Sequence, residues 1–335
     1  SSGAIASRCS VVELSKTAGK VDGAVVEADG RRFTVRATAV VNASGVWSDD
    51  IRALDEGTHP DSIRPAKGVH LTVPWVKIRN DVAVVIPVPK DKRSLFLVPW
   101  VACPDGTFKY TYIGTTDTDY DGPLIDPQCT KDDIDYVLRA VNASVTTNIT
   151  DADITGVWAG LRPLVKAASS GRTADLSRHH KVRVSASGVV TVTGGKLTTY
   201  RAMAEDAIDA VVDRCDMRAR CRTRKLPLLG AIGQIDQPVG TRAAHLADRY
   251  GGLADEIEAL MFGDPTLAAE LVPGLPYTRA EAIYAARHEM ACTLDDVLTR
   301  RTQARLIDRA AALRAAPAVA ALLATELEWD GAEIL

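Results

Sequence analysis

The sequence from residue 189 to 201 reads Val189-Val190-Thr191-Val192-Thr193-Gly194-Gly195-Lys196-Leu197-Thr198-Thr199-Tyr200-Arg201. Its first five residues have branched β-carbons, which favours a strand, and the glycine pair interrupts that strand. An amphipathic helix follows, with apolar residues at Met203, Ala204, Ala207, Ile208, Val211 and Val212. Such a turn brings backbone N–H groups together at a helix N-terminus. It either binds an anion or an electron-rich cofactor, or is only a tight connection.

Four further segments carry a resemblance to a known family. They are Ala39–Asp49 (with Val-Val-Asn-Ala-Ser-Gly-Val-Trp at its centre), Arg64–Leu71, Ile113–Asp117 and Ala159–Leu164. In this order and at these spacings, together with the glycine turn, they closely resemble the FAD-dependent glycerol-3-phosphate dehydrogenase family. The Gly-Gly-Lys-Leu-Thr-Thr-Tyr and Lys-Gly-Val-His boxes are the most specific parts. The resemblance continues through residues 285–303 and so spans nearly the whole chain.

The resemblance and the sequence pattern together predict an α/β fold. It combines an incomplete FAD/NAD(P)-binding domain of the amino-acid-oxidase-like type with a β-rich substrate cap and a C-terminal all-helical domain. We expect residues 1–50 and 166–225 to belong to the FAD-binding domain, residues 51–165 to the cap and residues 226–335 to the helical domain. Within the cap, Pro and Gly separate short apolar runs such as 82–88 and 95–100, which favours strands.

The dinucleotide-binding motif of this family is absent from the sequence. Members of this family begin with a strand, a G-x-G-x-x-G turn and a helix, and these elements bind the ADP half of FAD. No G-x-G-x-x-G occurs in the 335 residues. We therefore expect the chain to correspond to the C-terminal part of a longer enzyme.

Short local patterns predict where elements turn or begin. Asp29-Gly30 between alternating residues predicts a hairpin turn. Thr130 with Asp133 predicts the start of a helix, and Thr278 with Glu281 forms a second capping box.

The composition excludes some classes of protein. Lys and Arg number 40 against 43 Asp and Glu, a formal net charge of −3, so no nucleic-acid partner is expected. The six cysteines contain no C-x-x-C pair, which favours reduced thiols and a cytoplasmic location. No run of about 18 apolar residues occurs, so no membrane-spanning helix is predicted.

A basic run lies between residues 214 and 225 and comprises Arg214, Arg218, Arg220, Arg222, Arg224 and Lys225. Such a run is usually a solvated linker. The alternative is a contact with anionic lipid, which would suit an enzyme that delivers electrons to quinone. That alternative would place the protein peripherally on the inner face of the cell membrane.

The resemblance also implies a reaction and its partners. The reaction is the oxidation of sn-glycerol 3-phosphate to dihydroxyacetone phosphate in glycerol metabolism, with FAD as cofactor and quinone as electron acceptor. Two alternatives stay open: a glycerol-3-phosphate oxidase that uses O₂, and a non-catalytic fragment or subunit. A homo-oligomer is a further expectation.

Lys196 is the strongest candidate for a cofactor contact. A cation is disfavoured at a helix N-terminus by the helix dipole, so a purely structural role explains its place poorly. A cation near the N1/C2 edge of a flavin would stabilise the charge that the ring gains with a hydride. The resemblance implies such a contact, and it assigns further cofactor-binding positions to Val12, Ala43, Ser44, Gly45, Trp47, Gly195, Leu197, Thr198 and Thr199.

The substrate candidates each have a structural alternative. The planar guanidinium of Arg162 offers bidentate recognition of a phosphate and a role in catalysis, and the alternative is a surface salt bridge. His70 is either a structural histidine or, as the resemblance implies, a catalytic residue that accepts a proton from the alcohol. Lys67 is either a phosphate contact or a solvated charge. Thr115 and Thr116 either bind substrate or satisfy backbone in a turn.

Two patterns that suggest metals are set aside. Asp117, Asp119 and Asp121 open like a calcium loop, but position twelve is Gln128 instead of the required Glu. The pair His179-His180 has no cysteine or carboxylate at metal-ligand spacing, so we expect a solvated loop there.

Overall fold

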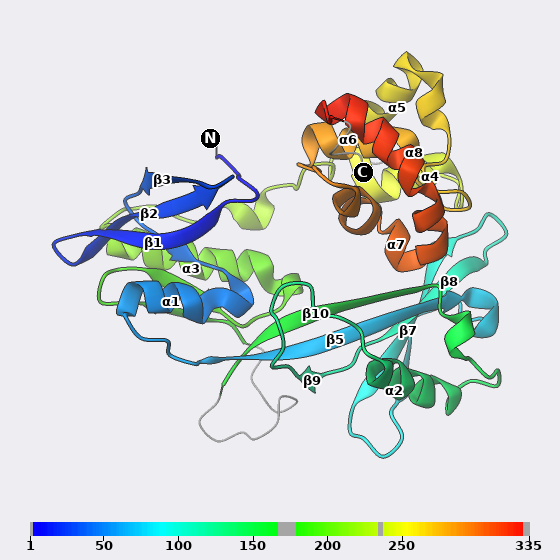
Figure 1. Cartoon of the computed structure of the whole chain (residues 1–335), viewed down its shortest axis with the longest axis horizontal. Helices are drawn as coiled ribbons and strands as arrows, with labels where there is room; N and C mark the ends of the chain where they lie inside the picture. Colours follow the sequence, from blue (N-terminus) through cyan, green and yellow to red (C-terminus); the bar gives the residue numbers. More distant parts are fainter. Residues whose placement is uncertain (1–2, 167–178, 234–236, 331–335) are drawn as a thin grey trace. The chain divides into compact units, whose positions relative to one another are not determined.

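The computed structural model describes residues 3–166, 179–233 and 237–330, which form two compact units (Figure 1). Unit 1 comprises Ser1–Gly68, Asp117–Pro127 and Gly160–Leu226, and unit 2 comprises Val69–Thr116, Gln128–Ala159 and Pro227–Leu335. This division differs from the four segments predicted from the sequence, because much of the predicted cap shares unit 2 with the helical segment. The assignment of those segments as domains stays a prediction, and its parts at 1–2, 167–178, 234–236 and 331–335 lie outside the described residues.

Unit 1 begins with a three-stranded antiparallel meander of β1 (Ser10–Thr17), β2 (Lys20–Ala28) and β3 (Arg31–Arg36). The hairpin predicted at Asp29-Gly30 is confirmed, because both residues have positive φ, 48° and 70°, as a tight two-residue turn requires. Leu14 and Val21 of this meander are buried in one cluster with Val189. The meander therefore packs against the segment that leads into the glycine turn.

A second small sheet in unit 1 carries both predicted glycine-containing turns. Its strands are β11 (Lys181–Val184), β12 (Val190–Thr193) and β4 (Val41–Asn42), and β12 pairs parallel with β4. After β4 the chain forms a short 3-10 turn, η1 (Gly45–Trp47), and helix α1 (Ser48–Glu56). After β12 it forms η5 (Leu197–Thr199) and helix α3 (Tyr200–Arg214), and η6 (Thr223–Lys225) follows. The predicted order of strand, glycine turn and helix is confirmed.

A six-stranded sheet with the order β10-β5-β8-β7-β6 forms the β-rich part of the chain. Its strands are β5 (Ile63–Pro74), β6 (Val84–Pro87), β7 (Ser94–Ala102), β8 (Phe108–Gly114) and β10 (Gly156–Val165), and the short β9 (Thr118–Asp119) pairs with β5 beside this path. The pairs β5–β8, β8–β7 and β7–β6 are antiparallel. The strands expected near 82–88 and 95–100 are present as β6 and β7.

Helix α2 (Lys131–Asn142) packs on one face of the sheet within unit 2. Its predicted start is confirmed, because the Thr130 backbone N–H donates to Asp133 Oδ2 at 2.9 Å. Val69, Leu71 and Val73 of β5 are fully buried in the same cluster as α2. Side chains alternate along a strand, so the residues between them, including His70, belong to the opposite face.

The C-terminal part of unit 2 is helical, as predicted. It contains α4 (Arg242–Tyr250), α5 (Ala254–Gly263), α6 (Arg279–His288), a π-helix (Asp296–Arg301), α7 (Ala304–Ile307) and α8 (Arg309–Leu327), with 3-10 turns at Gly251–Leu253 and Pro265–Ala268. Among the described residues, α8 alone has the length and apolar composition to cross a membrane, which the sequence analysis did not anticipate. A third of this stretch is buried, and its buried side chains, including Ala312, Val319 and Leu323, lie in the core of this helical domain.

Within unit 2, the sheet and the helical domain are joined by hydrogen bonds. Thr72 Oγ1 donates to Leu306 O and Thr155 Oγ1 donates to Ile307 O, both at 2.7 Å. The backbone N–H of Arg309 donates to Thr155 O at 2.8 Å. These bonds explain why sheet and helices form a single compact unit although separate domains were predicted for them.

Candidate functional site

The glycine turn of unit 1 has a backbone that only glycine adopts readily. Gly194 and Gly195 have φ of 72° and 81°, and a Cβ on Gly195 would lie 2.4 Å from Met203 Sδ. The next residues, Lys196 to Tyr200, are exposed, and the Leu197 side chain is 88% exposed. The turn therefore presents an ammonium group, an apolar side chain and the start of a 15-residue helix on one surface of unit 1.

The second turn is held by Asn42, which the sequence analysis did not single out. Asn42 is 3% exposed; its amide donates to Ser48 O at 2.9 Å and its Oδ1 accepts from Ser44 Oγ at 2.7 Å. It also reaches Thr191 Oγ1 of β12 at 3.4 Å. Asn42 thus fixes the Ala43-Ser44-Gly45 turn against the strand that leads to Gly194. The Asn-Ala-Ser-Gly pattern quoted for the resemblance already contained this residue.

The two turns have the chemistry that a flavin requires. The first turn of a helix leaves backbone N–H groups without intrahelical partners, and these donors suit an electron-rich ring edge. Trp47 is 42% exposed and Tyr200 is 50% exposed, so apolar surface is available for a planar ring. Gly195, Lys196 and the turn at Ser44 and Gly45 are the residues that would hold it. Val12 lies at a register irregularity of β1, and its predicted cofactor role stays a prediction.

Two of the predicted basic residues lie on neighbouring strands. Lys67 lies on β5 and Arg162 on β10, and β10 runs antiparallel to β5 because the Lys166 N–H donates to Ser62 O and the Thr155 N–H to Thr72 O, both at 2.8 Å. Lys67 is 7% exposed, so the solvated-charge alternative does not describe it. Its Nζ lies 5.8 Å from the centre of the Tyr120 ring.

Arg162 has an acidic neighbour that the sequence analysis treated only as a calcium candidate. Asp117 Oδ1 lies 3.5 Å from Arg162 Nη1, and the two side chains are 10% and 28% exposed. The next carboxylate of that pattern, Asp119, pairs with Arg64. Both carboxylates thus form ion pairs with arginines of the segments that carry the family resemblance, residues 64–71 and 159–164.

His70 lies in unit 2 within a group of aromatic rings. Its imidazole stacks on the indole of Trp158, with ring centres 4.9 Å apart, and the Tyr112 ring approaches its edge at 6.0 Å. A Cβ on Gly114 would lie 2.3 Å from His70 Cδ2, so only glycine leaves room for the ring there. Sequence analysis missed Trp158. Its spacing of four residues from Arg162 on one strand was the available signal, because both side chains lie on the same face.

The two threonines differ in burial. Thr116 is 1% exposed, and its hydroxyl accepts the Val69 N–H at 2.9 Å, between Lys67 and His70 on β5. Thr115 is half-buried and its hydroxyl donates to Thr116 O at 3.1 Å. Thr116 therefore satisfies backbone, the alternative stated for it above, and a substrate contact for either residue stays a prediction.

The histidine pair and the basic run of unit 1 make local polar contacts. His180 Nε2 lies 2.6 Å from Asp206 Oδ2, and Arg214 Nη1 donates to Thr38 O at 3.0 Å. Residues 218–225 are exposed. Arg214 is thus bound back onto unit 1, whereas the rest of the run lies on the surface as a linker would.

Comparison with known proteins decides the family. A model of the FAD dependent oxidoreductase family matches residues 2–207, and a model of the C-terminal domain of alpha-glycerophosphate oxidase matches residues 221–334. The chain belongs to the FAD-dependent oxidoreductase family that includes the glycerol-3-phosphate dehydrogenases. The resemblance stated from the sequence motifs and the predicted cofactor class are thereby confirmed.

Individual relatives agree with this family assignment. The chain is 41% identical to glycerol-3-phosphate dehydrogenase 2 of Mycobacterium tuberculosis (strain ATCC 25618 / H37Rv) and 39% identical to glycerol-3-phosphate dehydrogenase of Mycobacterium leprae (strain TN). Each match covers 98% of this chain and 57% of the relative, so the chain spans little more than half of their length. The structure of Bacillus halodurans glycerol-3-phosphate dehydrogenase complexed with FAD is similar with a TM-score of 0.80 at 28% identity, over 97% of this chain and 66% of that one. The predicted fold class is confirmed.

Proposed function

We propose that this chain supplies the substrate cap and the ring side of the flavin site of an enzyme that oxidises sn-glycerol 3-phosphate to dihydroxyacetone phosphate, with FAD as cofactor. The single observation that carries the proposal is the pair of basic residues, Lys67 and Arg162, on adjacent antiparallel strands of a member of this family. A phosphate ester needs such fixed cations.

Arg162 and Lys67 are assigned to the phosphate of the substrate. A guanidinium can bind two phosphate oxygens at once, and Arg162 also pairs with Asp117 through Nη1 at 3.5 Å. Asp117 limits where the guanidinium can turn. Lys67 adds a buried ammonium, whose attraction for a dianion is weakly screened by water.

His70 is assigned to the proton of the substrate hydroxyl. FAD, when bound, supplies the acceptor for the hydride that leaves the same carbon. Trp158 and Gly114 fix the plane of the imidazole, so its nitrogens stay in that plane. The ammonium of Lys196 and the N–H groups of its turn would stabilise the negative charge that the ring gains.

For the electron acceptor we propose quinone, reached by peripheral contact with a membrane. Four apolar side chains follow the basic run along the chain and are exposed by 65–91%: Leu226, Leu228, Leu229 and Ile232. Basic and apolar side chains in one stretch suit the headgroup region of an anionic bilayer. A homo-oligomer, and a location on the inner face of the cell membrane, belong to the same proposal.

The 335 residues contain no G-x-G-x-x-G turn, so the chain alone is expected to bind FAD weakly or not at all. The test therefore uses purified protein in which these residues are joined to a dinucleotide-binding segment that carries this turn, supplied with FAD. We expect a bound-flavin absorbance spectrum that bleaches when glycerol 3-phosphate is added without O₂ and returns when a short-chain quinone is added. If O₂ reoxidises the flavin and releases peroxide, while quinone does not reoxidise it, the enzyme is an oxidase and the dehydrogenase assignment is wrong. Absence of bound flavin at saturating FAD would instead assign the chain to a non-catalytic subunit.

A further inference from the structure

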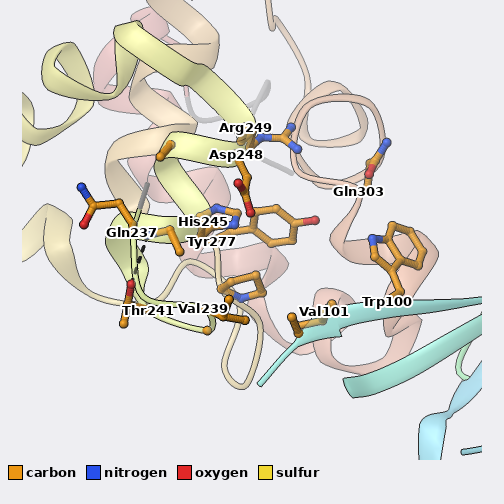
Figure 2. Close-up of a pocket in the computed structure, with 15 residues that line it drawn as sticks. Trp100, Val101, Gln237, Val239, Thr241, His245, Asp248, Arg249, Tyr277 and Gln303 are labelled. Carbon is orange, nitrogen blue, oxygen red and sulfur yellow. Dashed lines mark hydrogen bonds between the residues drawn. The ribbon is translucent and has the colours of Figure 1, made fainter. Parts of the chain in front are cut away.

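Unit 2 contains a cavity of about 570 Å³ that none of the predicted site residues lines (Figure 2). It lies where the end of β7 meets helix α4 and the loop before α6. Trp100 and Val101 line it from the sheet, and Gln303 from the start of α7. The helical domain contributes His245, Arg249 and Tyr277. A cavity of this volume is of the size that holds small molecules.

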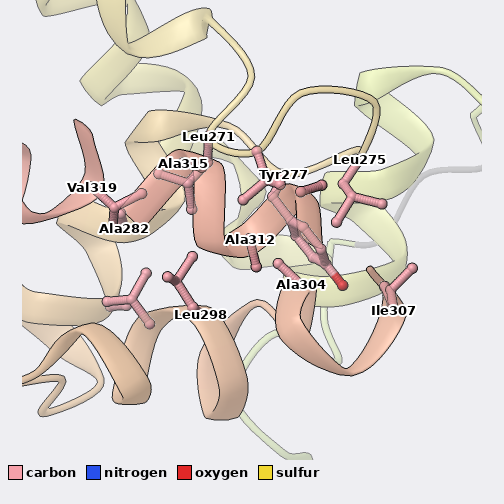
Figure 3. Packing of buried hydrophobic residues seen from close by; sticks show 14 of the residues in the cluster. Leu271, Leu275, Tyr277, Ala282, Leu298, Ala304, Ile307, Ala312, Ala315 and Val319 are labelled. Atoms are coloured by element: carbon pink, nitrogen blue, oxygen red, sulfur yellow. The ribbon is translucent and has the colours of Figure 1, made fainter. Parts of the chain in front are cut away.

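Tyr277 brings a buried polar group to this cavity. Its side chain is 3% exposed and belongs to the apolar core of the helical domain (Figure 3). Yet its hydroxyl makes no hydrogen bond within residues 3–166, 179–233 and 237–330, and Figure 2 shows it directed toward the side of the cavity where Trp100 lies. Burial raises the pKa of this hydroxyl well above its usual range, so it is a permanent donor. The hydroxyl therefore faces the cavity without a hydrogen-bond partner among the described residues, and it can donate to a molecule bound there.

Arg249 provides a second, fixed donor group. Its guanidinium lies 5.5 Å from the centre of the Tyr277 ring and 5.6 Å from that of Tyr250. Its one hydrogen bond to the described part of the chain runs from Nε to the Tyr250 hydroxyl, at 3.3 Å, and the same Nε lies 3.8 Å from Oε1 of the buried Glu281 in an ion pair. Both terminal nitrogens therefore keep N–H groups for another acceptor, and the contacts with the two rings and with Glu281 hold the side chain in place.

A buried carboxylate holds this wall in place from behind. Glu281 is fully buried; its Oε1 lies 2.9 Å from His245 Nε2 and accepts from the Tyr250 hydroxyl at 3.2 Å, and its Oε2 accepts the Thr278 N–H at 2.6 Å. Glu281 thus forms the predicted capping box and also fixes two residues beside the cavity. Such preorganisation reduces the conformational entropy that a ligand would have to remove on binding.

We propose that this cavity binds a small planar carboxylate, with the carboxylate on Arg249 and Tyr277 and the apolar plane toward Trp100 and Val101. A guanidinium with free terminal N–H groups and a neutral phenol together match the two oxygens of one carboxylate. Asp248 also lines the cavity, and its negative charge favours a ligand with one carboxylate over a dianion. The residues of this site take no part in the flavin or phosphate contacts, but Trp100 also meets Trp158, the residue stacked on His70, so the test measures binding and not turnover.

Benzoate is the probe for the test, with benzyl alcohol as the uncharged ligand of similar shape. We expect benzoate to change the tryptophan fluorescence of the full chain saturably, and benzyl alcohol to bind at least about tenfold more weakly. Trp100→Phe should remove most of the signal, whereas isothermal titration should still detect the binding.

Two variants locate the carboxylate. Tyr277→Phe removes only the hydroxyl and should weaken benzoate about fivefold, and Arg249→Met should weaken it about tenfold or more. Tyr284→Phe is the matched control, since its hydroxyl bonds to Glu256 at 3.2 Å outside the cavity lining, and its affinity should equal that of the wild type. The proposal fails if the wild type binds benzoate no better than benzyl alcohol. It also fails if Tyr277→Phe, at an unchanged melting temperature, binds benzoate as the wild type does.

Discussion

The imidazole of His70 lies flat on the indole of Trp158, with ring centres 4.9 Å apart and planes inclined by 8°. Trp100 meets the edge of the same indole at 5.9 Å, so the indole is itself held by the sheet. A stacked histidine cannot tilt its ring about the Cβ–Cγ bond without losing this contact. The pair therefore fixes the plane in which the imidazole nitrogens lie.

Replacing Trp158 should disturb the reaction through His70. We expect Trp158→Leu to lower kcat for glycerol 3-phosphate oxidation about tenfold or more with a smaller change in KM, because proton transfer depends on the orientation of the base. Steady-state kinetics of the flavin-loaded protein measures this. The NMR signals of the His70 ring protons should also move downfield, because they lose the shielding of the indole.

Trp158→Phe is the matched control for that experiment, since it keeps an aromatic face beside the imidazole. It should retain most of kcat and most of the upfield shift. If Trp158→Leu moves the NMR signals but leaves kcat unchanged, His70 is a structural histidine, which is the alternative stated in the sequence analysis.

Arg162→Lys tests the phosphate contact. Lysine keeps the charge but loses the planar fork, and a charge-assisted hydrogen bond contributes about 1.5–3 kcal/mol, so KM for glycerol 3-phosphate should rise at least about tenfold. Arg183→Lys is the control, because Arg183 pairs with Glu56 at the surface of unit 1. Equal kinetics of both variants would identify Arg162 as a salt-bridge residue held by Asp117.

Local features of this fold could be predicted from the sequence. The hairpin at Asp29-Gly30 and the capping boxes at Thr130 and Thr278 each depend on residues within three positions of one another. The glycine turn could likewise be read, because strand, glycine pair and helix are consecutive. Backbone chemistry over such short distances is largely independent of the rest of the chain.

Contacts between distant segments could not be predicted in this way. Trp158 stacks on His70 across 88 positions, and Asp117 faces Arg162 across 45. These pairs depend on which strands are neighbours in the sheet, and no sequence spacing encodes that. The cavity beside Tyr277 could not be predicted for the same reason, because its walls come from the sheet, α4 and the loop before α6, which are distant in sequence.

A buried carboxylate at the start of α1, Asp49, should make the stability of unit 1 depend on pH. Asp49 is 3% exposed and accepts the N–H groups of Ser62 and Ile63 at 2.5 and 2.8 Å. Burial opposes its ionisation, but the hydrogen bonds from Ser62 and Ile63 and the charge of Arg52 outweigh it, so its pKa is lowered. A carboxyl with a lower pKa in the folded state stabilises above its unfolded pKa, and this stabilisation is lost as the pH falls through the folded pKa.

Asp49→Asn should therefore lower the free energy of unfolding by about 2 kcal/mol at neutral pH. The difference from the wild type should shrink when the pH falls below about 4, where the unfolded carboxyl takes up its proton. Urea unfolding between neutral and acid pH measures both effects. Asp50→Asn is the control, because Asp50 is exposed and its one ion pair within the described residues is with His59 at 3.4 Å, and it should change stability little. A difference that is constant with pH would contradict the assigned role of the charge.

Lys196→Met tests the flavin contact at the glycine turn. Loss of a cation near the ring should lower the flavin reduction potential by about 30 mV or more, which corresponds to about 1.4 kcal/mol for a two-electron couple. The melting temperature should stay unchanged, because Lys196 is exposed and a cation contributes little at a helix N-terminus. Lys20→Met removes another exposed lysine of unit 1, bonded to Ala186 O at 2.9 Å, and should leave the potential intact. Equal potentials with a lowered melting temperature for Lys196→Met would make Lys196 a structural residue.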